Sequence, residues 1–171
     1  SPLMNEIVFP AGILQEPFFS PDYPMAYNFG GMGSVIGHEM THGFDDQGRK
    51  FDSDGNLNDW WTDKDARLYQ AKTDPIKTQF GKYLVGDRLV NGDLTQGENI
   101  ADLGGVSISF KSYLRYLKEN GDVKAKDFSA WGTFTPEQLF FINYARIWRG
   151  STRDEEMQKR LVTDPHSPPI F

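Results

Sequence analysis

Two of the chain's three histidines flank a glutamate in the segment His38-Glu39-Met40-Thr41-His42, which has the form H-E-x-x-H. On a helix, residues four positions apart share one face, so both imidazoles can bind a single Zn²⁺ at distances of about 2.0–2.1 Å. The glutamate between them lies close enough to act on a water molecule that the metal holds. The segment therefore predicts a catalytic zinc site, against the alternative of a helix that carries these side chains by chance.

Two acids four positions apart, Glu98 and Asp102, form a second group. Thr95 is a predicted N-cap with Glu98 three residues on, and the helix is expected to run to about Lys118. A zinc site with two histidines needs a third ligand, and a carboxylate from a separate helix is one solution. A ligating histidine also needs an acceptor for its other ring nitrogen. We interpret Glu98 as the ligand and Asp102 as that acceptor; the alternative is a pair of solvated surface acids.

The third histidine, His166, lies in a loop stiffened by prolines on both sides, Thr163-Asp164-Pro165-His166-Ser167-Pro168-Pro169. A histidine on a rigid loop suits hydrogen bonding to a developing oxyanion, where preorganised donors matter most. Asp164 is a candidate to hold the tautomer of His166. The alternative is an ordinary surface histidine.

Composition excludes several classes of protein. The length of 171 residues suits one domain with a buried core, and 38% hydrophobic residues favour folding over disorder. A net charge of −6 without a basic run argues against nucleic acid as a partner. The absence of cysteine excludes disulfides and thiolate metal sites, and fits either a reducing compartment or export. No apolar run suggests a membrane span and no signal-peptide pattern opens the chain; its start at Ser1 suggests a processed or excised piece.

Local patterns predict the elements that position these groups. We expect a helix over residues 29–42 and another over 63–83, capped by Thr62 and broken at Pro75. Residues 5–14 read as a short edge strand, and residues 84–94 as a hairpin that turns at Asn91-Gly92.

An acidic loop follows the H-E-x-x-H segment. Its Asp52-x-Asp54-x-Asn56 pattern suggests calcium, but Leu57 and Asp63 stand where a calcium loop needs glycine and glutamate. We therefore predict a turn rich in Asp and Asn side-chain hydrogen bonds.

Five segments together resemble the neprilysin and endothelin-converting-enzyme family of zinc metallopeptidases. They are, in order along nearly the whole chain, NEIVFPAGILQEPFF, HEMTHGFDDQGRKFD, GENIADLGG, QLFFINYARIWRG and DPHSPP. The resemblance implies a thermolysin-like (gluzincin) catalytic lobe that cleaves oligopeptides within the chain, typically before a hydrophobic residue. It also implies one Zn²⁺ per chain and an upstream lid domain in the same protein, which restricts substrates to small peptides.

The resemblance also implies roles for individual residues. His38, His42 and Glu98 would be the zinc ligands, Glu39 the catalytic base, Asp102 the partner of a ligand histidine, and His166 the stabiliser of the transition state.

The chain departs from the family pattern in three places. Arg149 stands where secreted animal members have a cysteine, so we expect a bacterial relative. An Asn-Ala-aromatic segment that pairs with substrate is expected upstream of Ser1, and an arginine is expected after Phe171. We therefore expect a catalytic lobe that is incomplete at both ends.

The sequence leads to one main expectation and two alternatives. We expect a mainly α, gluzincin-type zinc endopeptidase lobe with a short β component, formed by residues 1–171 as a single domain. One alternative is a metal-stabilised peptide-binding module without turnover. The other is a zinc aminopeptidase, which shares H-E-x-x-H with a distal glutamate but needs an acidic pocket for a free amine.

Overall fold

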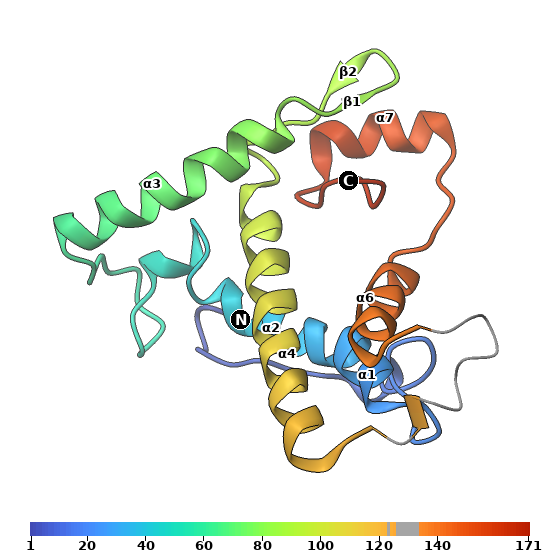
Figure 1. Ribbon diagram of the computed structural model, residues 1–171. Helices are drawn as coiled ribbons and strands as arrows, with labels where there is room; N and C mark the ends of the chain where they lie inside the picture. Colours follow the sequence, from blue (N-terminus) through green and yellow to red (C-terminus); the bar gives the residue numbers. More distant parts are fainter. Residues whose placement is uncertain (123, 126–133) are drawn as a thin grey trace. The chain divides into compact units, whose positions relative to one another are not determined.

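The computed structural model describes residues 1–122, 124–125 and 134–171, and these are mainly helical (Figure 1). Within these ranges, the helices of seven or more described residues are α2 (Ser34–His42), α3 (Asp63–Phe80), α4 (Gln96–Asn120), α6 (Pro136–Ile147) and α7 (Asp154–Thr163). The shorter helical segments are 3₁₀ turns at Ala11–Ile13 and Gly48–Lys50, helix α1 (Met25–Asn28) and a π-helical segment at Phe29–Gly33. Strands β1 (Leu84–Val85) and β2 (Arg88–Leu89) form an antiparallel hairpin. The expected mainly α architecture with a small hairpin is confirmed.

The backbone divides into two compact units. The first unit comprises Ser1–Glu6, Thr41–Ala101 and Gly150–Phe171, and the second comprises Ile7–Met40 and Asp102–Arg149. Helices α2 and α4 are each continuous from one unit into the next. The expectation of a single zinc-peptidase domain over residues 1–171 stays a prediction.

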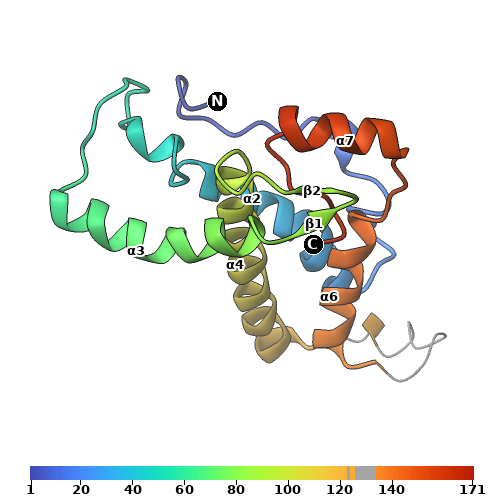
Figure 2. The same cartoon turned by 90° about the horizontal axis from the view of Figure 1, so that it is seen from above.

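Aromatic side chains form the core of the second unit, where α1 and α6 lie side by side (Figures 1 and 2). The buried members of this core are Tyr23, Ala26, Tyr27, Tyr113, Ala125, Leu139 and Phe140. Asn143 on α6 is fully buried, and its Nδ2 donates to Tyr27 O (2.8 Å) and Pro17 O (3.2 Å). These bonds satisfy loop carbonyls that would otherwise be costly to bury.

The backbones of α2 and α4 touch at two glycines. A Cβ on Gly105 would lie 2.6 Å from His38 N, and one on Gly37 would lie 2.8 Å from Gly105 O. Because only glycine lacks a Cβ, this approach requires glycine at both positions. The contact brings the helix that carries His38 directly against the helix that carries Asp102.

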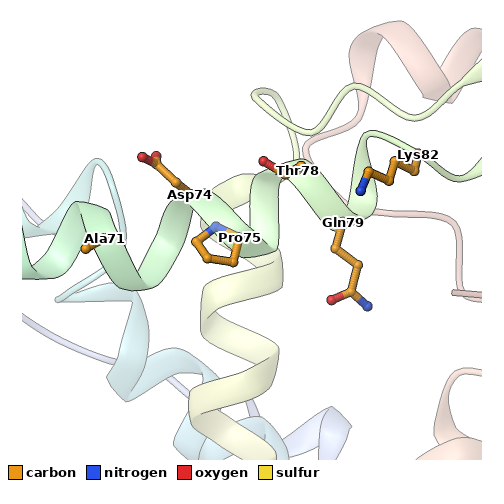
Figure 3. Close-up of a pocket in the computed structure, with 6 residues that line it drawn as sticks. All are labelled: Ala71, Asp74, Pro75, Thr78, Gln79 and Lys82. Atoms are coloured by element: carbon orange, nitrogen blue, oxygen red, sulfur yellow. The ribbon is translucent and has the colours of Figure 1, made fainter.

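In the first unit, α7 lies beside the hairpin (Figure 2). Gln158 Nε2 on α7 donates to Val85 O at 3.1 Å. The expected cap of α3 is confirmed, since the Thr62 side chain accepts a hydrogen bond from Asp65 N. The expected break at Pro75 was wrong, because α3 continues through this residue (Figure 3). Pro75 leaves the carbonyl of Ala71 without its helical donor, but both residues are exposed, so water can replace that bond.

The hairpin is real, but its predicted turn was wrong. The chain turns at Gly86, whose φ of +64° suits glycine, and Leu84 pairs with Leu89. Asn91 instead starts the approach to α4, where its Oδ1 accepts from Leu94 N at 3.1 Å. Gly92 is required for packing, because a Cβ there would clash with the carbonyl of Lys77.

Two further segments differ from expectation. Residues 5–14 form no strand; most are exposed, and a 3₁₀ turn at Ala11–Ile13 follows Pro10, which has no N–H for a strand ladder. The helix expected from Phe29 begins earlier, at Met25, and passes through the π-helical segment before α2.

The turn rich in Asp and Asn is confirmed. Asp52 Oδ1 accepts from the backbone N–H groups of Asp54 and Asn56, each at 3.0 Å, and its Oδ2 accepts from Asn58 Nδ2 at 3.1 Å. Gly55 closes the turn with a φ of +78°. The carboxylate of Asp52 therefore stabilises the loop itself.

Replacing Gly105 by alanine should lower the free energy of unfolding by about 1–3 kcal/mol, since an added methyl group must push α2 and α4 apart. Alanine alone favours a helix by about 1 kcal/mol over glycine, so a loss can only come from the clash. Urea denaturation measures the change. Gly150→Ala, with nothing within 4 Å of the added Cβ, is the control. A Gly105→Ala protein as stable as the parent would contradict the close contact.

Candidate metal centre

In the first unit, the end of α2 meets the start of α4. His42, the last residue of α2, has its Nε2 3.3 Å from Oε2 of Glu98, which lies in the first turn of α4. The side chains are mostly buried, at 28% and 16% exposure. An imidazole nitrogen and a carboxylate oxygen therefore face each other in a partly dry environment.

The other nitrogen of His42 is held by a residue that the sequence did not single out. His42 Nδ1 donates to Asp45 Oδ2 at 2.7 Å, while Asp45 Oδ1 accepts from the N–H groups of Gln47 (2.8 Å) and Gly48 (2.6 Å). Asp45 is 8% exposed. Its position three residues after His42, just past the helix end, was the signal that could have identified it.

Charge and hydrogen bonding explain the titration of this pair. Asp45 first, and then Glu98, raises the pKa of His42 to about 10, because both carboxylates stabilise the protonated ring more than burial destabilises it. Burial alone would raise the pKa of Asp45, but hydrogen bonds from His42, Gly48 and Gln47 lower it. A position that favours a proton so strongly also favours a cation, and metal binding replaces that proton.

In the second unit, His38 has an equivalent partner. His38 Nδ1 donates to Asp102 Oδ1 at 2.8 Å, and the side chain of His38 is 12% exposed. The contact between Gly37 and Gly105 sets this distance by holding α2 and α4 together. The pairing predicted for Asp102 is therefore present as a hydrogen bond.

The residues fit a zinc ion. His38, His42 and Glu98 each offer one ligand atom, and these atoms lie within 4.8 Å of one another. The aspartates hold the proton of each ring on Nδ1, which leaves the Nε2 lone pair for a metal. Two ligands about 2.0–2.1 Å from one tetrahedral ion stand about 3.3 Å apart, as His42 Nε2 and Glu98 Oε2 do.

His166 reaches Glu98 from the C-terminal loop. Its Nε2 is 3.3 Å from Glu98 Oε2, and its Nδ1 donates to Asp164 Oδ1 at 2.8 Å. Burial would raise the pKa of Asp164, but the hydrogen bonds from the backbone and ring of His166 lower it. The tautomer-holding contact suggested for Asp164 is present, and the ring is half exposed, at 54%.

Glu39 follows His38 on α2 and is partly exposed. The helix turns it about 100° from the face that carries the two histidines, so it lies beside the ligand face. Of the predicted site residues, the first unit brings together His42, Glu98 and His166, and the second brings together His38 and Asp102.

A shallow surface depression elsewhere in the first unit contains none of these groups. It is lined by Ala71, Asp74, Pro75, Thr78, Gln79 and Lys82, which lie along α3 and just after it (Figure 3). Its lining has no histidine and only one carboxylate, so it offers no comparable metal site.

The sequence matches the model of peptidase family M13 over residues 1–171, and the chain belongs to this family. The resemblance to the neprilysin and endothelin-converting-enzyme group is thereby confirmed.

Named relatives agree with this assignment. Neprilysin-1 of Caenorhabditis elegans is 49% identical over 98% of this chain and 22% of its own length. The solved structure of zinc metalloprotease Zmp1 of Mycobacterium tuberculosis, in complex with an inhibitor, superposes with a TM-score of 0.89 at 46% identity, covering 100% of this chain and 26% of that one. PepO of Lactobacillus rhamnosis superposes with a TM-score of 0.82 at 39% identity, covering 98% and 24%. The chain thus spans about a quarter or less of these relatives.

Within the described residues, none of the helices has both the length and the apolar character that a membrane span needs.

Asp45→Asn should weaken zinc binding by about 10–100-fold, the usual effect of losing a hydrogen-bonding partner of a metal ligand. In asparagine one carboxylate oxygen is replaced by an NH₂ group, which can only donate. This group would face either His42 Nδ1–H or the N–H groups of Gln47 and Gly48, which are also donors, so one of these contacts must be lost. Competition with a chromophoric chelator measures the affinity.

Asp46→Asn is the matched control, because it removes the same charge at the neighbouring residue. The Asp46 side chain accepts a hydrogen bond from Gln47 Nε2. Equal losses in the two variants would mean that charge, and not the bond to His42, sets the affinity.

Proposed function

We propose that this chain is the catalytic part of a zinc-dependent endopeptidase that hydrolyses oligopeptides. One observation carries the proposal: His38, His42 and Glu98 form a potential metal-binding group in a member of peptidase family M13. The aspartate behind each of the two histidines supports it, since ligating histidines ordinarily donate their second ring proton to a carboxylate.

Each polar residue has a distinct part in the proposed reaction. His38, His42 and Glu98 would hold a Zn²⁺ ion, which would supply a Lewis acid for lowering the pKa of water and polarising the scissile carbonyl. Glu39 accepts a proton from the attacking water and delivers it to the leaving amine. His166, with a proton on each ring nitrogen, donates from Nε2 to the oxyanion as it develops and from Nδ1 to Asp164. Asp102 and Asp45 keep the rings of His38 and His42 in the ligating tautomer.

Substrate and context follow from the family and are part of the proposal. Peptides are the substrate class of a peptidase family, and a lid domain elsewhere in the same protein would limit their size. Nucleic acid is not expected to bind, since the net charge is −6. A bacterial source stays a prediction.

Glu98→Ala should abolish zinc binding, whereas Asp102→Asn should only weaken it by about 10–100-fold, because the first change removes a ligand and the second a partner of a ligand. Metal analysis after dialysis measures both proteins beside the parent. Full zinc retention by Glu98→Ala would exclude Glu98 as a ligand.

Glu39→Gln should keep one zinc per chain and lose nearly all peptide turnover, since the amide has the shape of glutamate but cannot accept a proton. The assay is hydrolysis of an internally quenched peptide with a blocked N-terminus, which an aminopeptidase could not cleave. Glu119→Gln, an exposed change on α4, is the control for loss of charge. Substantial turnover by zinc-loaded Glu39→Gln would place the base elsewhere.

A further inference from the structure

Two neighbouring residues on α4 meet two neighbouring residues of the C-terminal loop. Glu98 Oε2 lies 3.3 Å from His166 Nε2, and Asn99 Oδ1 accepts a hydrogen bond from Ser167 Oγ at 2.8 Å. The helix and the loop are thus joined by two adjacent contacts in a fixed register. The first contact belongs to the proposed metal centre, and the second has no part in the proposed chemistry.

The direction of the second contact follows from a buried chain of hydrogen bonds. The carbonyl of Asn91 can only accept, so the Thr95 hydroxyl donates to it (3.1 Å). The Thr95 oxygen then accepts from Asn99 Nδ2 (3.1 Å), which turns Asn99 Oδ1 toward Ser167. Ser167 must therefore donate, and the amide of Asn99 has one allowed orientation.

Burial shows where the loop is attached. Asn99 and Thr95 are 2% and 3% exposed, and Pro168 is buried. His166 is half exposed and bonds Asp164 within its own loop. The bond between Ser167 and Asn99 is therefore the polar anchor that ties the residue next to His166 to a buried side chain of α4.

We propose that Asn99, through its hydrogen bond to Ser167, is a positioning residue that sets the place of His166 over the metal centre. The inference rests on the proposed role of His166. Prolines stiffen the loop from within but do not fix where it lies on α4. A misplacement of about 1 Å can cost as much as 100-fold in rate, so a buried anchor one residue away has a direct effect on turnover.

The test uses the intact protein with the quenched peptide and compares Ser167→Ala with Ser167→Thr. Ser167→Ala leaves the buried Asn99 Oδ1 without its donor, and kcat should fall about tenfold. KM and zinc content should stay unchanged, because His166 bonds charge that develops only in the transition state. Ser167→Thr keeps the hydroxyl and should retain most of the turnover. Ser112→Ala, which removes an exposed hydroxyl from α4, is the control.

Asn99→Ala deletes the other half of the same bond, so it should reproduce the kcat loss of Ser167→Ala, and the double variant should lose little more. If Asn99→Ala does not fold, Thr95→Val, which removes the donor to Asn91 and the acceptor of Asn99 Nδ2, takes its place. Unchanged kcat in Ser167→Ala would overturn the proposal, as would full additivity of the two changes.

A second double-mutant comparison, of Ser167→Ala with His166→Ala, tests whether the bond between Ser167 and Asn99 acts through His166. In a His166→Ala protein, adding Ser167→Ala should change kcat by less than about twofold. An equal loss with and without His166 would overturn the inference while leaving the proposed function intact. A His166→Ala protein with normal kcat would instead refute the proposed role of His166 itself, and the inference with it.

Discussion

The contact between the backbones of α2 and α4 is the constraint on which the site depends. Side chains at a helix contact usually keep the two helix axes about 8–10 Å apart. Gly37 and Gly105 have no side chains, so the backbones of α2 and α4 can touch. At that close approach, short side chains are long enough to meet: an aspartate reaches a histidine ring on the neighbouring helix. Two histidines on one helix and two acids on another, each pair spaced by four residues, then face each other without any loop having to position them.

A second regularity concerns the histidines. Each of the three in the chain has Nδ1 within 2.8 Å of an aspartate, namely Asp102, Asp45 and Asp164 for His38, His42 and His166. The carboxylates come from a separate helix, from the turn after α2 and from the loop itself. This common pairing directs the Nε2 atoms of His42 and His166 toward Glu98 and fixes the orientation of these rings before a ligand arrives.

The sequence predicted what repeats with the period of a helix and missed what depends on tertiary contacts. The i, i+4 spacing in His38 and His42, and again in Glu98 and Asp102, predicted which side chains share a helix face. The N-cap pattern of Thr95 and Glu98 predicted the second helix. Asp45 was missed because it lies beyond the helix, where no periodicity marks it. Asn91-Gly92 has the composition of a hairpin turn, but packing against Lys77 and the approach to α4 use it differently. Pro75 did not break α3, because a helix on the surface can leave one carbonyl to water.

The π-helical segment Phe29–Gly33 has a consequence for how the protein tolerates insertions and deletions. A π turn accommodates an extra residue in a helix that would otherwise be regular. Each residue of an α-helix advances the direction of the side chains by about 100°. Deleting one residue from this segment would let the chain relax to a regular helix, and the face that carries His38 would keep nearly the same direction, because the π turn has already absorbed the extra residue. The π turn therefore preserves the angular phase of the metal-binding face, whereas a deletion within the regular turns of α2 would rotate part of that face by about 100°.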